Sequence, residues 1–191
     1  MEIDDPETEL LRLIGRRVAH RRGELRLTLD EVADRSGVSR AMVSRIERGE
    51  VHASAVVLDR LCAGLDMTLS ALFARETMAP LLRRTDQPVW RDPQSGYVRR
   101  EVAPAGTGSP VRLVEIEFPP ESTVDFAPYE RRGVDQHIWL LDGEIEITVG
   151  GTTHHLHAGD CLHMRLDAGD TFRNVSSRTA RYAVILTRDA R

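Results

Sequence analysis

The chain of 191 residues lacks the features of several special classes of protein. No apolar run reaches the roughly 18 residues of a membrane-spanning helix, and the acidic residues 1–7 do not resemble a signal peptide. Its only two cysteines, Cys62 and Cys161, form no Cys-x-x-Cys pair, so neither a disulfide framework nor a zinc knuckle is supported. We expect a globular cytoplasmic protein in which both thiols serve as packing residues.

The charges are distributed unevenly along the chain. Residues 12–60 contain 11 arginines and 7 acidic residues, a net charge of +4, whereas the whole chain carries −4, which leaves −8 for the remainder. Binding to DNA phosphates releases counterions and is the sequence-independent part of DNA affinity. A small basic region on an acidic body is therefore typical of a DNA-binding protein. Helices with mixed surface charges are the alternative explanation.

Apolar residues at helical spacing dominate the first part of the chain. Leu10, Ile14 and Val18 predict a first amphipathic helix over about residues 7–24. A second helix begins at Thr28. Further segments with helical spacing follow it and continue to Phe73. Five short helices around one core are predicted, with the fourth beginning near Ser54.

The second and third of these helices have well-specified boundaries. Thr28 and Glu31 form a capping box, in which each side chain satisfies a backbone N–H at the start of the second helix. Gly37 suits the left-handed conformation that ends that helix. Ser39 caps the third helix, which Gly49 ends.

This two-helix pattern resembles the helix-turn-helix domain of the lambda-repressor and Cro type, found in the xenobiotic-response-element (XRE) family of bacterial regulators. The resemblance covers residues 10–73. It implies that the third helix enters the major groove of double-stranded DNA. A helical bundle with a protein-binding face is the alternative.

The resemblance assigns roles to seven residues. Base contacts are implied for Arg40, Ala41, Ser44 and Arg45, and phosphate contacts for Thr28, Ser39 and Arg48. The two arginines suit base recognition because a guanidinium can donate two hydrogen bonds to guanine. Leu29 and Glu50 depart from the polar or basic residues usual in the family, which predicts low non-specific affinity. The family also suggests a structural ion pair between Arg22 and Glu47.

The pattern changes to period two after about residue 88. Apolar residues alternate with glutamates over residues 114–118 and 144–149, and Gly- and Pro-containing turns separate such segments. We predict antiparallel strands in a small sandwich or barrel. The predicted organisation is a helix-turn-helix domain over 7–75, a linker over 76–87 and a second domain over 88–190.

The segments 140–150, 156–160 and 170–174 resemble the two motif blocks of the cupin family. The resemblance implies an antiparallel β-barrel of the jelly-roll type. Metal-binding cupins have histidine or glutamate at four positions that are here Tyr129, Arg131, Gln136 and Asp170. Arginine does not deprotonate, and neutral glutamine and tyrosine are poor ligands. We therefore predict no metal and no cofactor.

The other histidines of this domain are not expected to form a metal site. His155 and His157 share one face of a short strand before a tight turn, together with the neighbouring His154, and are expected to face solvent. His137 is expected to point away from the interior, because side chains alternate along a strand. His163 remains a candidate for lining it.

The predicted barrel interior suits a small polar metabolite. Its candidate ligand-binding residues are Tyr129, Arg131, Gln136, His163 and Asp170. Arg131 would bind a carboxylate and Asp170 an ammonium, which suggests an amino acid or an amine. The alternative is that Arg131 and Asp170 pair with each other in a ligand-free barrel used for dimerisation.

Together these patterns predict a sequence-specific transcriptional regulator whose cupin domain senses an effector. Two recognition helices about 34 Å apart are needed for useful specificity, so we expect a homodimer on a pseudo-palindromic operator. The rival prediction is a metal-dependent oxygenase or epoxidase. The same domain order occurs in an iron-dependent phosphonate epoxidase, whose His and Glu ligands this chain lacks.

Overall fold

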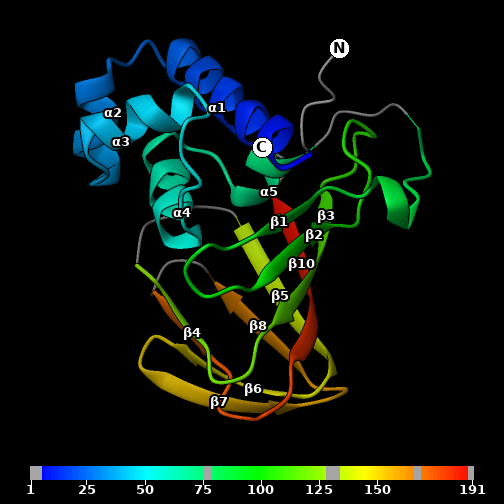
Figure 1. Ribbon diagram of the computed structural model, residues 1–191. Coiled ribbons are helices and arrows are strands. Elements are labelled where there is room, and N and C mark those ends of the chain that lie inside the picture. Colours follow the sequence, from blue (N-terminus) through cyan, green and yellow to red (C-terminus); the bar gives the residue numbers. More distant parts are fainter. Residues whose placement is uncertain (1–5, 75–78, 128–133, 166–168, 189–191) are drawn as a thin grey trace. The chain divides into compact units, whose positions relative to one another are not determined.

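The computed structural model describes residues 6–74, 79–127, 134–165 and 169–188. The chain divides into two compact units, Met1–Phe73 and Ala74–Arg191 (Figure 1). We call them the helical unit and the sheet unit after their described elements. Among the described helices, none has the length and apolar character needed to span a membrane.

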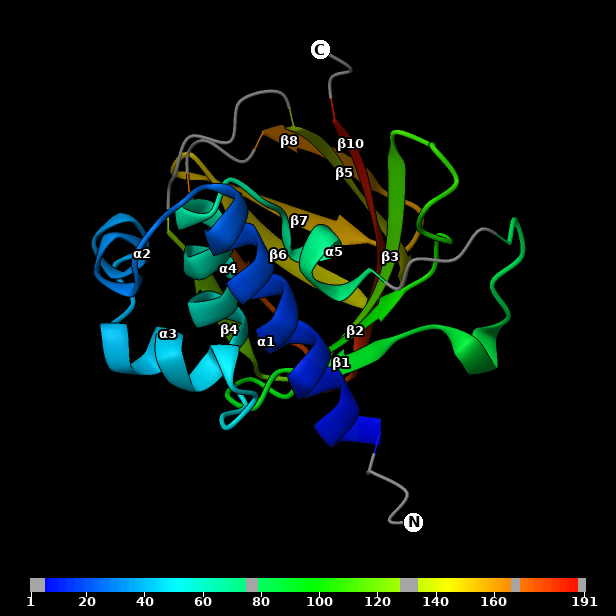
Figure 2. The ribbon, with the colours of Figure 1, turned by 90° about the horizontal axis from the view of Figure 1, so that it is seen from above.

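The described part of the helical unit contains five helices, as the apolar spacing predicts (Figure 2). They are α1 (Pro6–Glu24), α2 (Leu29–Ser36), α3 (Arg40–Glu47), α4 (Ala55–Gly64) and α5 (Leu69–Phe73). Their inward side chains form one apolar core. It includes Ile14, Val18, Val32, Val43, Ile46, Leu58, Leu61, Leu65, Leu72 and Phe73, all of which are buried.

Local capping groups determine where these helices begin and end. The Thr28 hydroxyl accepts a hydrogen bond from the Glu31 backbone nitrogen at 3.2 Å, and the Glu31 carboxylate accepts one from the Thr28 backbone at 2.7 Å. Gly37 ends α2 at a φ of 64°, where a Cβ would be strained. Ser39 and Ser54 cap α3 and α4 with their side chains. The capping predictions are confirmed.

A close approach between α1 and α3 holds the helix-turn-helix segment. A Cβ atom built on Gly15 would lie 2.5 Å from the Glu47 carbonyl oxygen and 2.6 Å from that of Ile46. Both neighbours are backbone atoms that cannot rotate away. Glycine is therefore the residue that lets the two helices meet here.

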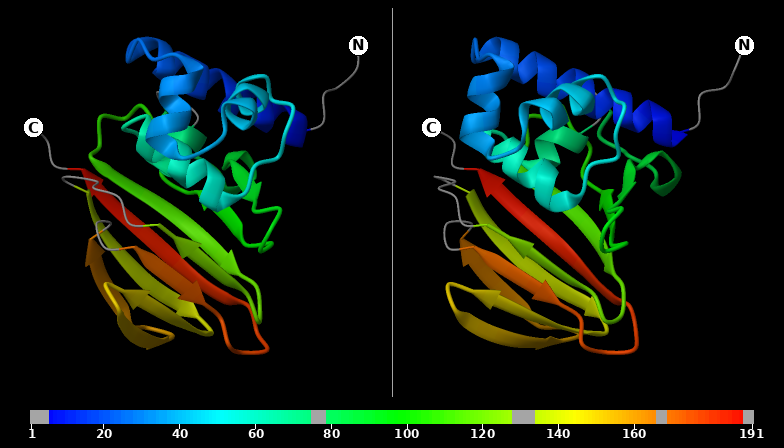
Figure 3. Two further views of the ribbon diagram at one scale, coloured as in Figure 1. Left: turned by 90° about the vertical axis from the view of Figure 1, so that its left-hand side faces the viewer. Right: turned by 60° about the vertical axis from the view of Figure 1, so that its left-hand side comes forward.

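The sheet unit contains ten strands in its described part (Figure 3). A 3-10 helix, η1 (Arg84–Asp86), precedes them. The strands are β1 (Val89–Arg91), β2 (Val98–Glu101), β3 (Val111–Phe118), β4 (Thr123–Phe126), β5 (Val134–Asp142), β6 (Glu144–Val149), β7 (Thr152–His157), β8 (Cys161–Arg165), β9 (Asp170–Arg173) and β10 (Ala180–Arg188).

These strands form two antiparallel sheets, with the orders β1-β2-β3-β10-β5-β8 and β4-β9-β6-β7. The sheets meet through their apolar faces: the ring of Tyr182 on β10 stacks on that of Phe172 on β9, with centroids 6.0 Å apart. The prediction of a closed barrel is therefore corrected. The described strands form two separate hydrogen-bonded sheets, held together by packing of their inner faces.

Asn174 connects the turn after β9 to the end of β3. Its side chain is fully buried, and its amide nitrogen donates to the carbonyl oxygens of Phe118 at 3.2 Å, Pro119 at 3.0 Å and Arg178 at 2.7 Å. The amide oxygen accepts from the Ser176 backbone at 3.0 Å. One side chain thus satisfies backbone groups that the turn would otherwise bury unpaired.

Candidate DNA interface and effector site

Helix α3 buries one face and leaves the other open. Val43 and Ile46 are 0% and 2% exposed, which anchors the helix in the core. The predicted base-contacting residues lie on the remaining surface: Arg40, Ala41 and Arg45 are exposed and Ser44 is half-buried. The helical unit therefore presents two guanidinium groups on the helix that the resemblance assigns to the major groove.

The two guanidinium groups differ in their partners. Arg40 forms an ion pair with Asp30 on α2 at 3.2 Å, and both side chains are mostly exposed. Such a pair contributes only about 0–1 kcal/mol, so Arg40 can exchange its partner at little cost. Within the described residues the Arg45 side chain makes no hydrogen bond or ion pair, although its charge helps to lower the pKa of Glu50. Asp30 is a neighbour that the sequence pattern did not identify.

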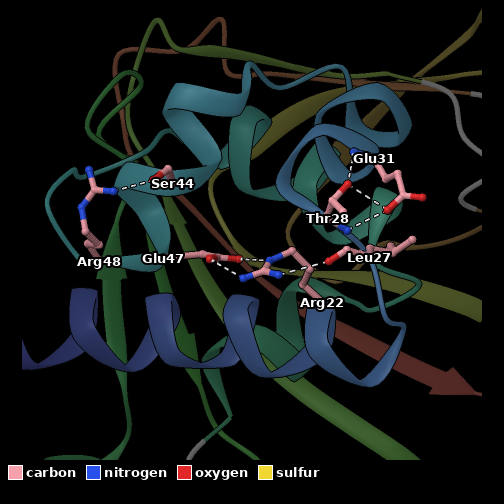
Figure 4. Close-up of polar contacts among 7 residues, drawn as sticks. All are labelled: Arg22, Leu27, Thr28, Glu31, Ser44, Glu47 and Arg48. Carbon is pink, nitrogen blue, oxygen red and sulfur yellow. Dashed lines mark hydrogen bonds and ion pairs between the residues drawn. The ribbon is translucent and has the colours of Figure 1, made fainter.

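The Arg48 side chain is already bound by Glu50 and Ser44, and Figure 4 shows its contact with Ser44. Its guanidinium donates to both carboxylate oxygens of Glu50, at 2.6 and 2.8 Å, and to the Ser44 hydroxyl at 2.5 Å. The side-chain hydrogen bonds between Arg48 and Glu50 raise the pKa of Arg48 and lower the pKa of Glu50. A phosphate that binds Arg48 must compete with this carboxylate.

The N-terminus of α2 is likewise already bound by an acidic side chain of the same chain (Figure 4). The Glu31 carboxylate accepts from both the backbone nitrogen and the hydroxyl of Thr28, at 2.7 and 2.8 Å. These bonds, the backbone one first, lower the pKa of Glu31. A helix N-terminus normally favours a phosphate, but here a carboxylate of the chain already lies beside Thr28.

A bidentate ion pair beneath this surface connects α1 with the end of α3 (Figure 4). Arg22 donates to the two Glu47 oxygens at 2.7 and 2.9 Å and to the Leu27 carbonyl at 3.1 Å. The hydrogen bond to Glu47 raises the pKa of Arg22. The predicted structural pair is confirmed.

Two of the predicted effector-binding residues lie on the inner faces of the sheet unit. Gln136 on β5 and Asp170 on β9 are 7% and 5% exposed. The Gln136 amide nitrogen lies 3.6 Å from the Met164 sulfur, to which it donates. Tyr129 and Arg131 lie outside the described residues.

His163 does not lie with Gln136, and the prediction that it lines the interior is corrected. Its side chain is 53% exposed and lies 3.4 Å from the Asp135 carboxylate. Strand register pairs it with His137, and the two rings are 4.8 Å apart. Because side chains alternate along β8, burial of Met164 directs His163 outward. The outward position predicted for His137 is confirmed.

His155 and His157 face solvent, as predicted, whereas His154, which was grouped with them, is half-buried. His155 and His157 are exposed and lie 3.3 and 3.8 Å from Glu146 and Glu144 on the neighbouring strand β6. Across the described ranges, no group of three or more His, Cys, Asp or Glu side chains has an arrangement suited to a metal ion.

The inner face of the large sheet also carries a charged pair that the sequence analysis missed. Arg99 and Glu101 on β2 are 8% and 7% exposed at the side chain, with 2.9 Å between guanidinium and carboxylate. Near them, burial raises the pKa of Tyr182 well above its ordinary value, so its phenol stays neutral. The i, i+2 spacing in a strand places both charges on one face, but charged residues are usually assigned to the solvent side.

Comparisons with known protein families agree with the division of the chain into a helical unit and a sheet unit. The helix-turn-helix domain family matches residues 13–72, and the cupin domain family matches residues 114–186. The HTH-type transcriptional regulator SutR of Escherichia coli K12 is 24% identical over 156 residues, which is 81% of this chain and 83% of that protein.

A solved structure has the same fold over nearly the whole chain. The HTH_3 family transcriptional regulator from Vibrio cholerae is 22% identical, with a TM-score of 0.78 over 96% of this chain and 99% of its own. The fold and motif thus define a protein with a helix-turn-helix domain followed by a cupin domain. The chain is a helix-turn-helix transcriptional regulator of the XRE type with a carboxy-terminal cupin domain.

Proposed function

We propose that α3 enters the major groove of double-stranded DNA and that the protein acts as a homodimer on a pseudo-palindromic operator. The observation that carries this proposal is the open face of α3, where Arg40 and Arg45 are exposed on a helix whose other face is fully packed. One such helix reads only a few base pairs. Two helices about 34 Å apart read successive major grooves and gain specificity.

The contacts of the helical unit support different roles for its arginines. Arg45 is available to a guanine, and Arg40 becomes available when its exposed pair with Asp30 opens. Thr28, Ser39, Arg48 and the helix starts are the proposed phosphate contacts, with Ala41 and Ser44 beside the bases. Because Glu50 and Glu31 already pair with Arg48 and Thr28, we expect weak binding to random DNA.

The test uses operator fragments selected from the genome of the host and scrambled fragments of equal length. Arg45→Ala should lower affinity for the operator about 5- to 150-fold, the equivalent of about 1–3 kcal/mol, and should change binding to scrambled DNA much less. Arg16→Ala, which removes one exposed charge from α1, is the matched control. Equal losses on both DNAs would identify Arg45 as a phosphate contact instead.

For the sheet unit, we propose that its interior binds a small polar metabolite, such as an amino acid or an amine, that modulates operator binding in the cytoplasm. The alternation of strands between the two sheets supports a jelly-roll arrangement, and buried polar groups at Gln136 and Asp170 supply contacts. An effector changes DNA affinity only through its different affinity for the two arrangements of the DNA-binding units.

Thermal shift against a panel of amino acids and amines tests this second proposal. Asp170→Asn should remove the shift given by the active compound and its effect on operator binding, while binding of the effector-free protein to DNA stays unchanged. A metal-dependent oxygenase is the competing function. Stoichiometric iron in protein purified without chelator, together with turnover of a phosphonate, would establish it instead.

A further inference from the structure

Four neighbouring strands present a regular array of side chains on the outer face of the large sheet. Strands β3, β10, β5 and β8 lie side by side (Figure 3). Strand register aligns three rows across them: Val111, Thr187, Asp135 and Arg165; Leu113, Ile185, His137 and His163; Glu115, Ala183, Trp139 and Cys161. We call these twelve positions the outer grid.

The outer grid contains exposed apolar side chains, while Glu115 and Ala183 within it are buried. Trp139 is 48% exposed and Val111 is 41% exposed, and Leu113 and Ile185 between them are half-buried. Trp139 is the single aromatic among the large apolar side chains that are exposed in the described part of the chain. A contiguous apolar surface with a polar border marks an association site, and tryptophan is enriched where binding energy concentrates.

We propose that two copies of this chain pair through the outer grid. The two-fold axis runs parallel to the strands, midway between the stacked large sheets of the two copies and in line with the gap between β10 and β5. The proposal rests on the proposed function, because a pseudo-palindromic operator requires two copies. With this axis, each row of one copy lies opposite the same row of the second copy. Strand β10 of one copy then lies over β5 of the other, and β3 lies over β8.

This arrangement matches large side chains with small ones and avoids contacts between like charges. Trp139 of each copy faces Ala183 of the other, a small side chain that is 8% exposed in the single chain, so the indole lies over the sheet without meeting a large side chain. Ile185 faces the imidazole of His137. In the outermost row, Asp135 faces the Thr187 hydroxyl and Arg165 faces Val111. A surface must be self-complementary in this sense to form a two-fold contact.

The size of the outer grid predicts the strength of the contact. With strands about 4.8 Å apart and about 6.8 Å between alternate residues of a strand, four strands and three rows cover on the order of 400 Å² per copy. A standard interface buries about 800 Å² per partner. The dimer is therefore reversible on dilution, and DNA that binds both recognition helices strengthens it.

The test measures the oligomeric state of the full chain by sedimentation velocity over a dilution series. Wild type is expected to dissociate reversibly. Trp139→Glu should weaken association at least about 10-fold, because a charge is buried without a partner. Val111→Arg should weaken it to a similar extent, because it faces Arg165 of the second copy with a like charge. Val175→Glu is the matched control. Val175 is also 48% exposed but lies in the turn after β9, and its variant should associate like wild type.

Circular dichroism verifies that each variant is folded, and Val111→Arg carries the test if Trp139→Glu is not folded. A wild type that is monomeric at every concentration would overturn the proposal. So would two folded grid variants that associate like wild type, or a Val175→Glu variant that dissociates as they do.

The same variants separate this proposal from the proposed function. If the outer grid pairs two copies but α3 does not read DNA, the two grid variants still become monomeric while wild type binds no operator. If α3 reads DNA but another surface pairs the copies, wild type binds the operator and the grid variants remain dimeric. In that case the grid proposal is rejected and the DNA proposal stands.

Discussion

The helical unit and the sheet unit depend on contacts of different range along the chain. In the helical unit, caps such as Thr28 with Glu31 form between residues three positions apart. In the sheet unit, β10 lies between β3 and β5, so that Ala180 pairs with Phe118. Local patterns therefore specify the helices, whereas the sheets need strands that are distant in sequence to meet.

The chain offers a direct way to observe the two units separately. Both of its tryptophans, Trp90 and Trp139, belong to the sheet unit, and the described α-helices belong to the helical unit. Tryptophan fluorescence therefore reports on the sheet unit, while far-ultraviolet circular dichroism reports mainly on the helices.

The largest effect is expected at the turn that Asn174 holds. Asn174→Leu removes the hydrogen bonds to three carbonyl oxygens, one of them fully buried, and to the Ser176 backbone, which should cost about 3–5 kcal/mol of the free energy of unfolding. Denaturant unfolding followed by fluorescence should show the loss, with the helical transition unchanged. Val175→Ala, on the exposed neighbour, is the control. If both transitions fall together, the two units do not unfold independently.

The next effect concerns the ion pair that joins α1 to α3. Arg22→Ala leaves the largely buried Glu47 carboxylate unpaired and should lower the free energy of unfolding of the helical unit by about 1–3 kcal/mol. Arg48→Ala removes an equally bidentate but exposed pair, and its melting temperature should match that of wild type. Circular dichroism measures both. Equal stability of the two variants would contradict a structural role for Arg22.

Two glycines of α1 give a matched test of the approach between α1 and α3. A Cβ on Gly15 collides with backbone atoms of α3, whereas one on Gly23 meets no atom within 4 Å. Gly15→Ala should destabilise the helical unit by about 1–3 kcal/mol. Gly23→Ala should stabilise it by about 0.5–1 kcal/mol, because alanine favours the helix. Opposite signs in circular dichroism melts are the expected result, and equal signs would reject it.

A small loss of stability is expected at the cap of α2. Thr28→Ala should cost about 1 kcal/mol. The pKa of Glu31 is lowered in the folded state from its ordinary 4.5. Its contribution is therefore fully present above pH 4.5 and is lost as the pH falls through the lowered folded value.

Melting temperatures from neutral to acidic pH check this prediction. Glu31→Gln should remove that part of the pH dependence, while the comparable change Glu24→Gln at the end of α1 should leave it in place. A pH profile of Glu31→Gln that matches wild type would show that the carboxylate contributes nothing through its protonation.

Sequence reasoning performed best where a residue interacts with its near neighbours. It placed the caps at Thr28 and Ser39, and the family resemblance assigned base contacts to Arg40 and Arg45, which the structure places on the exposed face of α3. It identified Glu50 as unusual without showing that Glu50 pairs with Arg48. That contact depends on where the chain turns after α3.

The interior of the sheet unit was harder to predict. His163 was a candidate for the interior and lies outside it, and Arg99 with Glu101 was overlooked although the pair is buried. A shift of one residue moves every side chain of a strand to the other face. Charge alone does not reveal which face is inside.

The sequence by itself determined the two-unit organisation, the helix boundaries and the presence of a helix-turn-helix segment, because helical spacing and capping act over three or four residues. Only the tertiary structure decided that the strands form two sheets, that Asn174 joins distant segments, and which polar side chains face inward. Those outcomes depend on pairing between strands far apart in the chain, and a single segment carries no record of its distant partner.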